Sequence, residues 1–176
     1  IDLLINLSAS PFSIEKQKKR LKILKTISKR NSVEICYCNL IGGQDELVFD
    51  GKSMILNNNG NVVAYAKEFD EDLLIKNINF QKNKSKICLS KKDDNHYLKK
   101  VLLALSLGLK DYVHKNNFNK ILLGISGGID SALVASIAVS ALGKKNVLGK
   151  EYKKGKKALA VVIKDLVNHP NCRDFV

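Results

Sequence analysis

The sequence has little of several residue types, and each shortage argues against a class of protein. Its 176 residues include no tryptophan, 6% aromatic residues and three arginines, at positions 20, 30 and 173. Stacking aromatics and bidentate arginines carry much of nucleic-acid recognition. We therefore expect no nucleic-acid partner despite the net charge of +13, because abundant lysine and asparagine fit the codon bias of an AT-rich genome. No apolar run reaches the roughly 18 residues that span a bilayer, so we expect no membrane partner.

Residues that bind metals or form disulfides are few and scattered. The four cysteines, at positions 36, 38, 88 and 172, form no CxxC pair, and the three histidines, at 96, 114 and 169, are isolated. This pattern lacks the ligand spacing of a zinc site. Unpaired thiols fit a reducing compartment, so we expect a cytoplasmic protein. Cys36 and Cys38 lie in an apolar stretch, and we expect both to pack on one face of a buried strand.

The first part of the chain, residues 1–81, predicts strands and one amphipathic helix. Strands are expected at residues 2–8, 33–41, 46–49, 53–56 and 62–67. A helix is expected at residues 14–30, with an apolar stripe formed by Ile14, Leu21, Leu24 and Ile27. The Asp-Gly pair at 50–51 predicts a hairpin turn between its two flanking strands. Gln44, Asp45 and Glu46 predict a polar turn, and residues 57–61 predict another.

The second part of the chain shows a different pattern. Residues 82–95 are polar and charged and predict a linker between domains, with a short strand at 87–89. A helical pattern starts near residue 96, followed by a strand at 120–124, a glycine-rich turn, a helix at 131–142 and a strand at 145–148. This order is typical of a doubly wound α/β fold. Residues 150–176 form a basic tail with an amphipathic stretch at 158–167, and the tail remains unassigned.

The strongest motif lies in the glycine-rich turn between the expected strand and helix. Its residues are Gly124, Ile125, Ser126, Gly127, Gly128, Ile129, Asp130 and Ser131. Adjacent glycines let the backbone approach a ligand closely, and amides in such a turn, together with a helix N-terminus, attract anions. The two serine hydroxyls can donate to phosphate oxygens, and Asp130 suits a Mg²⁺ ion that bridges it to phosphate. The alternative is a glycine-rich turn that binds no ligand.

This loop is not a Walker A motif, and it resembles SGGxDS, the pyrophosphate-loop signature of ATP pyrophosphatases. Residues 107–113 (LGLKDYV) and the Ala-Leu pair after the loop are similar to NAD synthetases. The NLSASPF sequence at 6–12 and GGQDELVFDG at 42–51 are similar to the nitrilase-like glutaminase domain of glutamine-dependent NAD synthetases. The resemblance covers about residues 1–149.

The resemblance implies an α/β protein made of parts of two domains. Residues 1–81 would form part of a nitrilase-like α/β sandwich, and residues 96–149 the start of a doubly wound, adenine-nucleotide α-hydrolase-like domain. The implied activity is that of a ligase, which amidates deamido-NAD to NAD with ATP, Mg²⁺ and glutamine and is a homo-oligomer at full length. Ser10 and Lys16 match positions that bind glutamine, residues 124–131 match the ATP loop, and Asp130 matches the magnesium-linked aspartate.

The resemblance also leaves one family feature unmatched. The Glu, Lys and Cys of the family's glutaminase precede the matched region, and the chain begins at Ile1 rather than at Met. We therefore expect a fragment without a glutaminase nucleophile and without glutaminase activity of its own. The alternatives are a residual ATP-binding module without turnover, which could be the product of a degraded gene, and a basic nucleic-acid binder.

Overall fold

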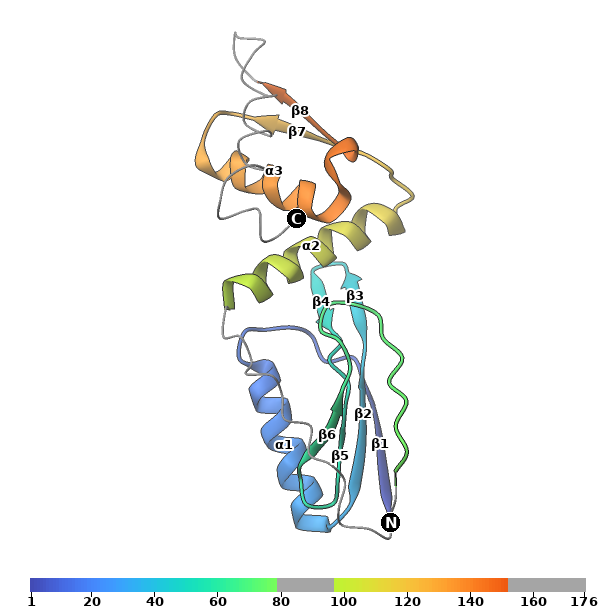
Figure 1. Ribbon diagram of the computed structural model, residues 1–176. Coiled ribbons are helices and arrows are strands. Elements are labelled where there is room, and N and C mark those ends of the chain that lie inside the picture. Colours follow the sequence, from blue (N-terminus) through green and yellow to red (C-terminus); the bar gives the residue numbers. More distant parts are fainter. Residues whose placement is uncertain (79–96, 152–176) are drawn as a thin grey trace. The chain divides into compact units, whose positions relative to one another are not determined.

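The computed structural model describes residues 1–78 and 97–151, and the chain divides into two compact units, Ile1–Ala104 and Leu105–Val176 (Figure 1). The boundary falls within helix α2 (Tyr97–Lys115). The expected linker at 82–95, its strand at 87–89 and the amphipathic stretch at 158–167 lie outside the described residues. The assignment of domains to residues 1–81 and 96–149 stays a prediction.

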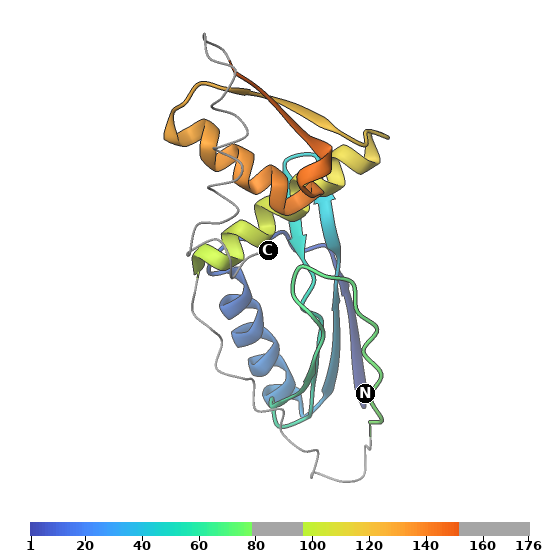
Figure 2. The ribbon, with the colours of Figure 1, turned by 45° about the horizontal axis from the view of Figure 1, so that its top comes forward.

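The first unit is built on a four-stranded sheet in the order β1-β2-β5-β6. Its elements are β1 (Leu3–Ser8), α1 (Lys16–Asn31), β2 (Glu34–Asn39), β3 (Ile41–Gln44), β4 (Leu47–Asp50), β5 (Met54–Leu56) and β6 (Val62–Tyr65). Strands β1 and β2 run parallel, with α1 as their crossover, whereas β2, β5 and β6 pair antiparallel. Helix α1 covers one face of this sheet, and the segment after β6 runs along the other face (Figures 1 and 2).

The core of this unit lies between α1 and the sheet. Leu24 of α1 packs among buried side chains that include Ile35, Tyr37, Met54 and Leu56. The expected stripe is confirmed for Leu21, Leu24 and Ile27, which all belong to this cluster or pack against it. Ile14 is an exception because it precedes α1 and is 51% exposed.

The two cysteines of β2 differ in their surroundings. Side chains alternate along a strand, so Ile35 and Tyr37 face α1 while Cys36 packs against a second cluster on the opposite face. Cys38 is exposed. The expectation that both cysteines are core residues is therefore wrong for Cys38, because the second cluster does not extend to the end of β2.

This difference predicts unequal reactivity of the two thiols. Burial and the nearby Glu34 carboxylate raise the pKa of Cys36, which is only partly accessible. Because the thiolate is the reactive form, we expect iodoacetamide to label Cys38 well before Cys36 at pH 8. Peptide mass spectrometry over time measures this order, with Cys36→Ser and Cys38→Ser variants to assign the peptides. Equal labelling rates would contradict the burial difference.

The expected hairpin at Asp50–Gly51 is wrong. Strand β4 pairs with β3 in a separate two-stranded sheet, while β5 pairs with β2 and β6. Gly51 has φ +62° and its N–H donates to Leu40 O, so the pair carries the chain from one sheet to the other. The single strand expected at 33–41 is accordingly split at Leu40 into β2 and β3. The polar turn at 44–46 is confirmed, since it links β3 to β4.

The asparagine-rich turn between β5 and β6 is anchored on α1. The buried Ser28 hydroxyl is hydrogen-bonded to Asn57 O, and Asn57 Oδ1 accepts the N–H of Asn61. Gly60 has φ +72°, and a Cβ there would lie 2.9 Å from Lys25 O. The turn therefore needs glycine at position 60 for both its conformation and its contact with α1.

Replacing Gly60 by alanine should destabilise the first unit. The added methyl would lie 2.7 Å from Lys29 Cγ, which can move aside, but also 2.9 Å from Lys25 O, which belongs to the backbone of α1. The left-handed conformation is also strained for alanine. We expect a loss of about 1–3 kcal/mol in free energy of unfolding, as for other overpacked sites. Urea unfolding followed by circular dichroism measures it, with the exposed Asn59→Ala as the matched control. A Gly60→Ala variant as stable as that control would show that the turn is not docked on α1.

The second unit contains a strand–helix–strand motif. Strand β7 (Ile121–Ile125) and strand β8 (Val147–Glu151) are parallel, from Ile121↔Val147 to Ile125↔Glu151. Helix α3 (Ile129–Leu142) and the short 3₁₀ helix η1 (Lys144–Asn146) connect them. These elements confirm the expected order of strand, helix and strand. However, α3 begins two residues earlier than predicted, and β8 begins at Val147 rather than at residue 145 because residues 145 and 146 belong to η1. Within residues 1–78 and 97–151, no helix is long and apolar enough to cross a membrane.

Candidate functional site

The glycine loop, residues 124–131, connects the end of β7 to the first turn of α3. Ile125 is buried at 4% exposure and anchors the loop in the second unit. The five residues that follow, from 126 to 130, are all exposed, and Ser131 is half-buried. Because α3 begins at Ile129, Asp130 and Ser131 both lie in its first turn. The loop is therefore anchored at Ile125, while the residues that lead into the N-terminus of α3 are accessible to a ligand.

Two serines and two glycines set the shape of the loop. Gly127 has φ +83°, a conformation that side-chain-bearing residues rarely adopt. Ser126 Oγ lies 3.2 Å from Ser131 Oγ and 3.4 Å from the Gly128 N–H. The Ser131 hydroxyl donates to Gly128 O at 2.9 Å. These contacts bring the two expected phosphate donors together at the start of α3.

The start of α3 favours a negatively charged ligand. Its N-cap residue is Gly128, and no side chain in the described part of the protein caps the first amides. Uncapped N–H groups and the positive end of the helix dipole form an anion site. Asp130 also lies in this turn, where its negative charge suits the dipole.

The residues of the loop fit Mg²⁺ only as a partner of phosphate. Among the described residues, no group of three His, Cys, Asp or Glu side chains could hold a metal ion. Mg²⁺ takes six oxygens and commonly uses one or two carboxylates plus waters and substrate phosphates. Asp130 can supply one such carboxylate at the N-terminus that would bind the phosphates. The loop thus suits a magnesium polyphosphate rather than a metal held by protein alone.

The two residues expected to bind glutamine lie in the first unit. Ser10 follows β1 and is half-buried, and Lys16 is the half-buried first residue of α1. Lys16 N–H donates to Ser13 O in the turn that starts the helix. Within the described part of the chain, neither the Ser10 hydroxyl nor the Lys16 ammonium has a hydrogen-bond or ion-pair partner, and no bond joins the two residues.

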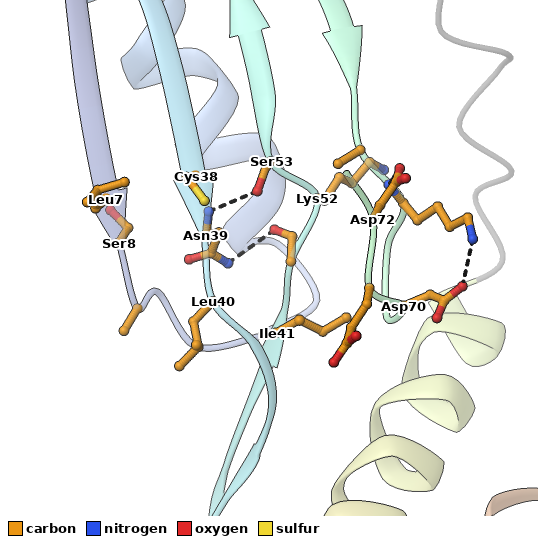
Figure 3. Close-up of a pocket in the computed structure, with 15 residues that line it drawn as sticks. Leu7, Ser8, Cys38, Asn39, Leu40, Ile41, Lys52, Ser53, Asp70 and Asp72 are labelled. Carbon is orange, nitrogen blue, oxygen red and sulfur yellow. Dashed lines mark hydrogen bonds and ion pairs between the residues drawn. The ribbon is translucent and has the colours of Figure 1, made fainter. Parts of the chain in front are cut away.

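A pocket of about 670 Å³ lies where β1 and β2 end (Figure 3). Its lining includes Ala9 and Asn39, but Ser10 and Lys16 are not among the described residues that line it. On its far side, Lys67 Nζ lies 3.0 Å from Asp70 Oδ2, and this hydrogen bond raises the pKa of the lysine. The lining of the pocket therefore includes Asn39 on one side and the Lys67–Asp70 ion pair on the other.

A buried ion pair next to this pocket was not anticipated from the sequence. Arg20 Nη2 lies 2.7 Å from both carboxylate oxygens of Asp50, and the two side chains are 8% and 0% exposed. Asn39 Nδ2 lies 3.3 Å from the same carboxylate. The helix pattern contained a signal for Arg20, because it lies four residues before Leu24 on the buried face. Nothing local in the sequence distinguished Asp50 or Asn39.

Comparisons with known proteins show which family the chain resembles. A model of the NAD synthase family matches residues 101–157. The chain is 36% identical to the glutamine-dependent NAD(+) synthetase of Aquifex aeolicus, over 84% of this chain and 31% of that protein. It is 42% identical to the same enzyme of Synechocystis sp., over 85% of this chain and 27% of that protein.

Solved structures show the same likeness in three dimensions. The glutamine-dependent NAD+ synthetase from Acinetobacter baumannii, solved with adenosine diphosphate, matches with a TM-score of 0.72 at 27% identity, over 99% of this chain and 32% of that one. The enzyme from Cytophaga hutchinsonii, at 24% identity, has the same fold over 82% of this chain with a TM-score of 0.63.

The chain spans about three tenths of the length of these relatives, 31% and 27% for the two curated enzymes. The matches include both the first unit and the glycine loop, as the motifs predicted. Sequence, family model and fold therefore agree that this chain resembles a section of the glutamine-dependent NAD(+) synthetases, which are ligases.

Proposed function

We propose that the chain functions in NAD biosynthesis, as a section of an enzyme that amidates deamido-NAD to NAD with ATP and with glutamine as the nitrogen donor. The observation that carries this proposal is the glycine loop at the start of α3, with its paired serines and uncapped amides. An ADP-bound neighbour of the same fold supports an adenine nucleotide as its ligand.

Five residues of the loop have a role in the proposed nucleotide site. Gly127 and Gly128 let the phosphates approach the backbone, and the amides at the start of α3 donate to phosphate oxygens. The Ser126 and Ser131 hydroxyls lie 3.2 Å apart, and each would donate to a phosphate oxygen after rotating its hydrogen away from its present partner, which for Ser131 is Gly128 O. Asp130 would hold a Mg²⁺ ion against the same phosphates. A Mg²⁺ ion held there would supply positive charge for the phosphate oxygens during cleavage of ATP between its α and β phosphates.

We infer that the two units are parts of two enzyme domains. A sheet covered by α1 on one face supports a partial nitrilase-like sandwich over residues 1–81. The parallel β7–α3–β8 motif supports the start of a doubly wound, pyrophosphate-loop domain over residues 96–149. Residues 82–95 would link them in a cytoplasmic, homo-oligomeric enzyme, and residues 150–176 keep no assigned role.

We also infer that Ser10 and Lys16 bind glutamine. Both are half-buried, and their hydroxyl and ammonium groups have no partner in the described part of the chain. A hydroxyl and a cation suit the polar and carboxylate groups of an amino acid. The family's Glu, Lys and Cys glutaminase residues have no match in the chain, so binding without hydrolysis is expected.

One set of assays on the purified chain separates the proposal from its alternatives. We expect MgATP to bind, inorganic pyrophosphate to compete with it, and no NAD to form from deamido-NAD and glutamine. NAD formation with ammonia in place of glutamine would show synthetase turnover, whereas binding without turnover favours the residual ATP-binding module. No MgATP binding, together with DNA binding that weakens steeply with salt, would support the nucleic-acid binder instead.

A further inference from the structure

The segment after β1 is held tightly although it has no regular secondary structure. At one end, Ser10 pairs with the side chain of Asn39. At the other, Phe12 N–H donates to Val48 O at 2.7 Å, and its ring meets Phe69 edge-on at 5.2 Å between centroids. The segment that carries Ser10 is therefore fixed at both of its ends.

The contact between Asn39 and Ser10 has two parts. Asn39 Oδ1 accepts the Ser10 N–H at 2.9 Å, and Asn39 Nδ2 donates to Ser10 O at 3.2 Å. The side-chain amide thus satisfies both backbone groups of Ser10, as a neighbouring strand would. The hydroxyl is then the one polar group of Ser10 with no partner in the described residues.

The orientation of the Asn39 amide is fixed from its other side. Asn39 is 6% exposed, and its Nδ2 lies 3.2 Å from Gly51 O and 3.3 Å from Asp50 Oδ1. A flipped amide would put its oxygen against these acceptors, which no hydrogen could bridge. Arg20 in turn holds the Asp50 carboxylate. The backbone of Asn39 is fixed as well, because its N–H donates to Ser53 Oγ at 3.0 Å (Figure 3).

We propose that Asn39 is a positioning residue, which fixes the Ser10 backbone through its side-chain amide so that the Ser10 hydroxyl is presented to glutamine. This inference rests on the proposed glutamine site. It assigns Asn39 no contact with glutamine, so Asn39 acts only through Ser10. It also explains why a buried asparagine ends β2 beside a pocket, where an apolar residue would otherwise be expected.

The test is a double-mutant cycle on glutamine affinity, measured by calorimetry on the full 176-residue chain. We expect Ser10→Ala and Asn39→Ala each to weaken glutamine binding about tenfold, and the double variant to weaken it no further, because one hydrogen bond is lost in all three. Asn31→Ala, an exposed asparagine bonded within α1, is the control and should bind like the wild type. A purely structural role for Asn39 would give effects that multiply.

Multiplying effects, an unchanged affinity in Asn39→Ala, or no glutamine binding by the wild type would each overturn the proposal. MgATP titration of the same samples distinguishes failure of the glutamine proposal from failure of the nucleotide site, because MgATP binding would persist in the first case and be absent in the second. If Asn39→Ala does not fold, hydrogen exchange of the wild type decides. Protection of the Ser10 amide comparable to that of β2 supports the proposal, and fast exchange there overturns it.

Discussion

Replacing Asp50 by alanine is expected to lower the free energy of unfolding of the first unit by about 3–5 kcal/mol, the usual cost of breaking a buried ion pair. Asp50 is fully buried and accepts two 2.7 Å bonds from Arg20. Without it, the guanidinium remains in the core with no counter-charge. Arg20 already has two buried nitrogens, Nε and Nη1, that have no hydrogen-bond partner among the described residues. Most small domains are stable by only about 5–15 kcal/mol, so this variant should be close to unfolding.

Urea unfolding measured by circular dichroism tests this expectation. The exposed Asp2→Ala is the matched control and should change stability little. A second variant, Arg20→Met with Asp50→Leu, removes both charges and should be far more stable than Asp50→Ala alone. A loss of less than about 1 kcal/mol in Asp50→Ala, the range of exposed pairs, would show that the pair is not buried in solution.

Replacing Gly128 by serine is expected to weaken MgATP binding at least tenfold, or about 1.4 kcal/mol, without destabilising the protein. Gly128 has φ −84° and ψ 163°, which any residue can adopt. A Cβ there would meet only Ser126 Oγ, at an ordinary 3.5 Å. Serine is also a better N-cap than glycine by a few tenths of a kcal/mol. The fold therefore does not require glycine at this position, whereas a phosphate lying against the backbone would.

A Gly127→Ser variant, compared with Gly128→Ser, separates an effect on the fold from an effect on nucleotide binding. The φ of +83° at Gly127 strains any side chain, although the described residues, apart from its two chain neighbours, place no atom within 4 Å of the added Cβ. We expect Gly127→Ser to lose both thermal stability and nucleotide affinity, and Gly128→Ser to lose affinity alone. Thermal unfolding and MgATP calorimetry on both variants measure the difference. Wild-type affinity in Gly128→Ser would mean that no ligand approaches the loop there.

The sequence predicted those elements whose signals are local. A short apolar run located β1, the helical spacing of apolar residues located the Leu21–Leu24 stripe of α1, and the glycine-rich turn placed the loop between β7 and α3. The turn at 50–51 failed because its Asp-Gly signal is also local, whereas Arg20, thirty residues away, draws the Asp50 side chain into the core. Long-range pairing overrode the turn propensity at that point.

The candidate sites were likewise predictable where their residues are close in sequence, and not where they depend on residues far apart in the chain. The residues of the glycine loop lie together because they are consecutive in the chain, and the resemblance supplied their proposed ligand. Asn39 was missed because its role depends on partners at positions 10 and 50, which the sequence does not relate to it. Cys38 was expected in the core because strand alternation shows which residues share a face, but not how far a cluster on that face extends.

Calorimetric titration of the chain with ATP, with and without Mg²⁺, tests whether the glycine loop binds a magnesium nucleotide. We expect ATP to bind more tightly with Mg²⁺ and Asp130→Asn to remove this gain while it preserves the fold, because Asp130 is exposed and bonded to no other described side chain. Magnesium-dependent binding that is unchanged in Asp130→Asn would contradict the assignment of Asp130. Absence of ATP binding by the wild type would contradict the nucleotide site itself.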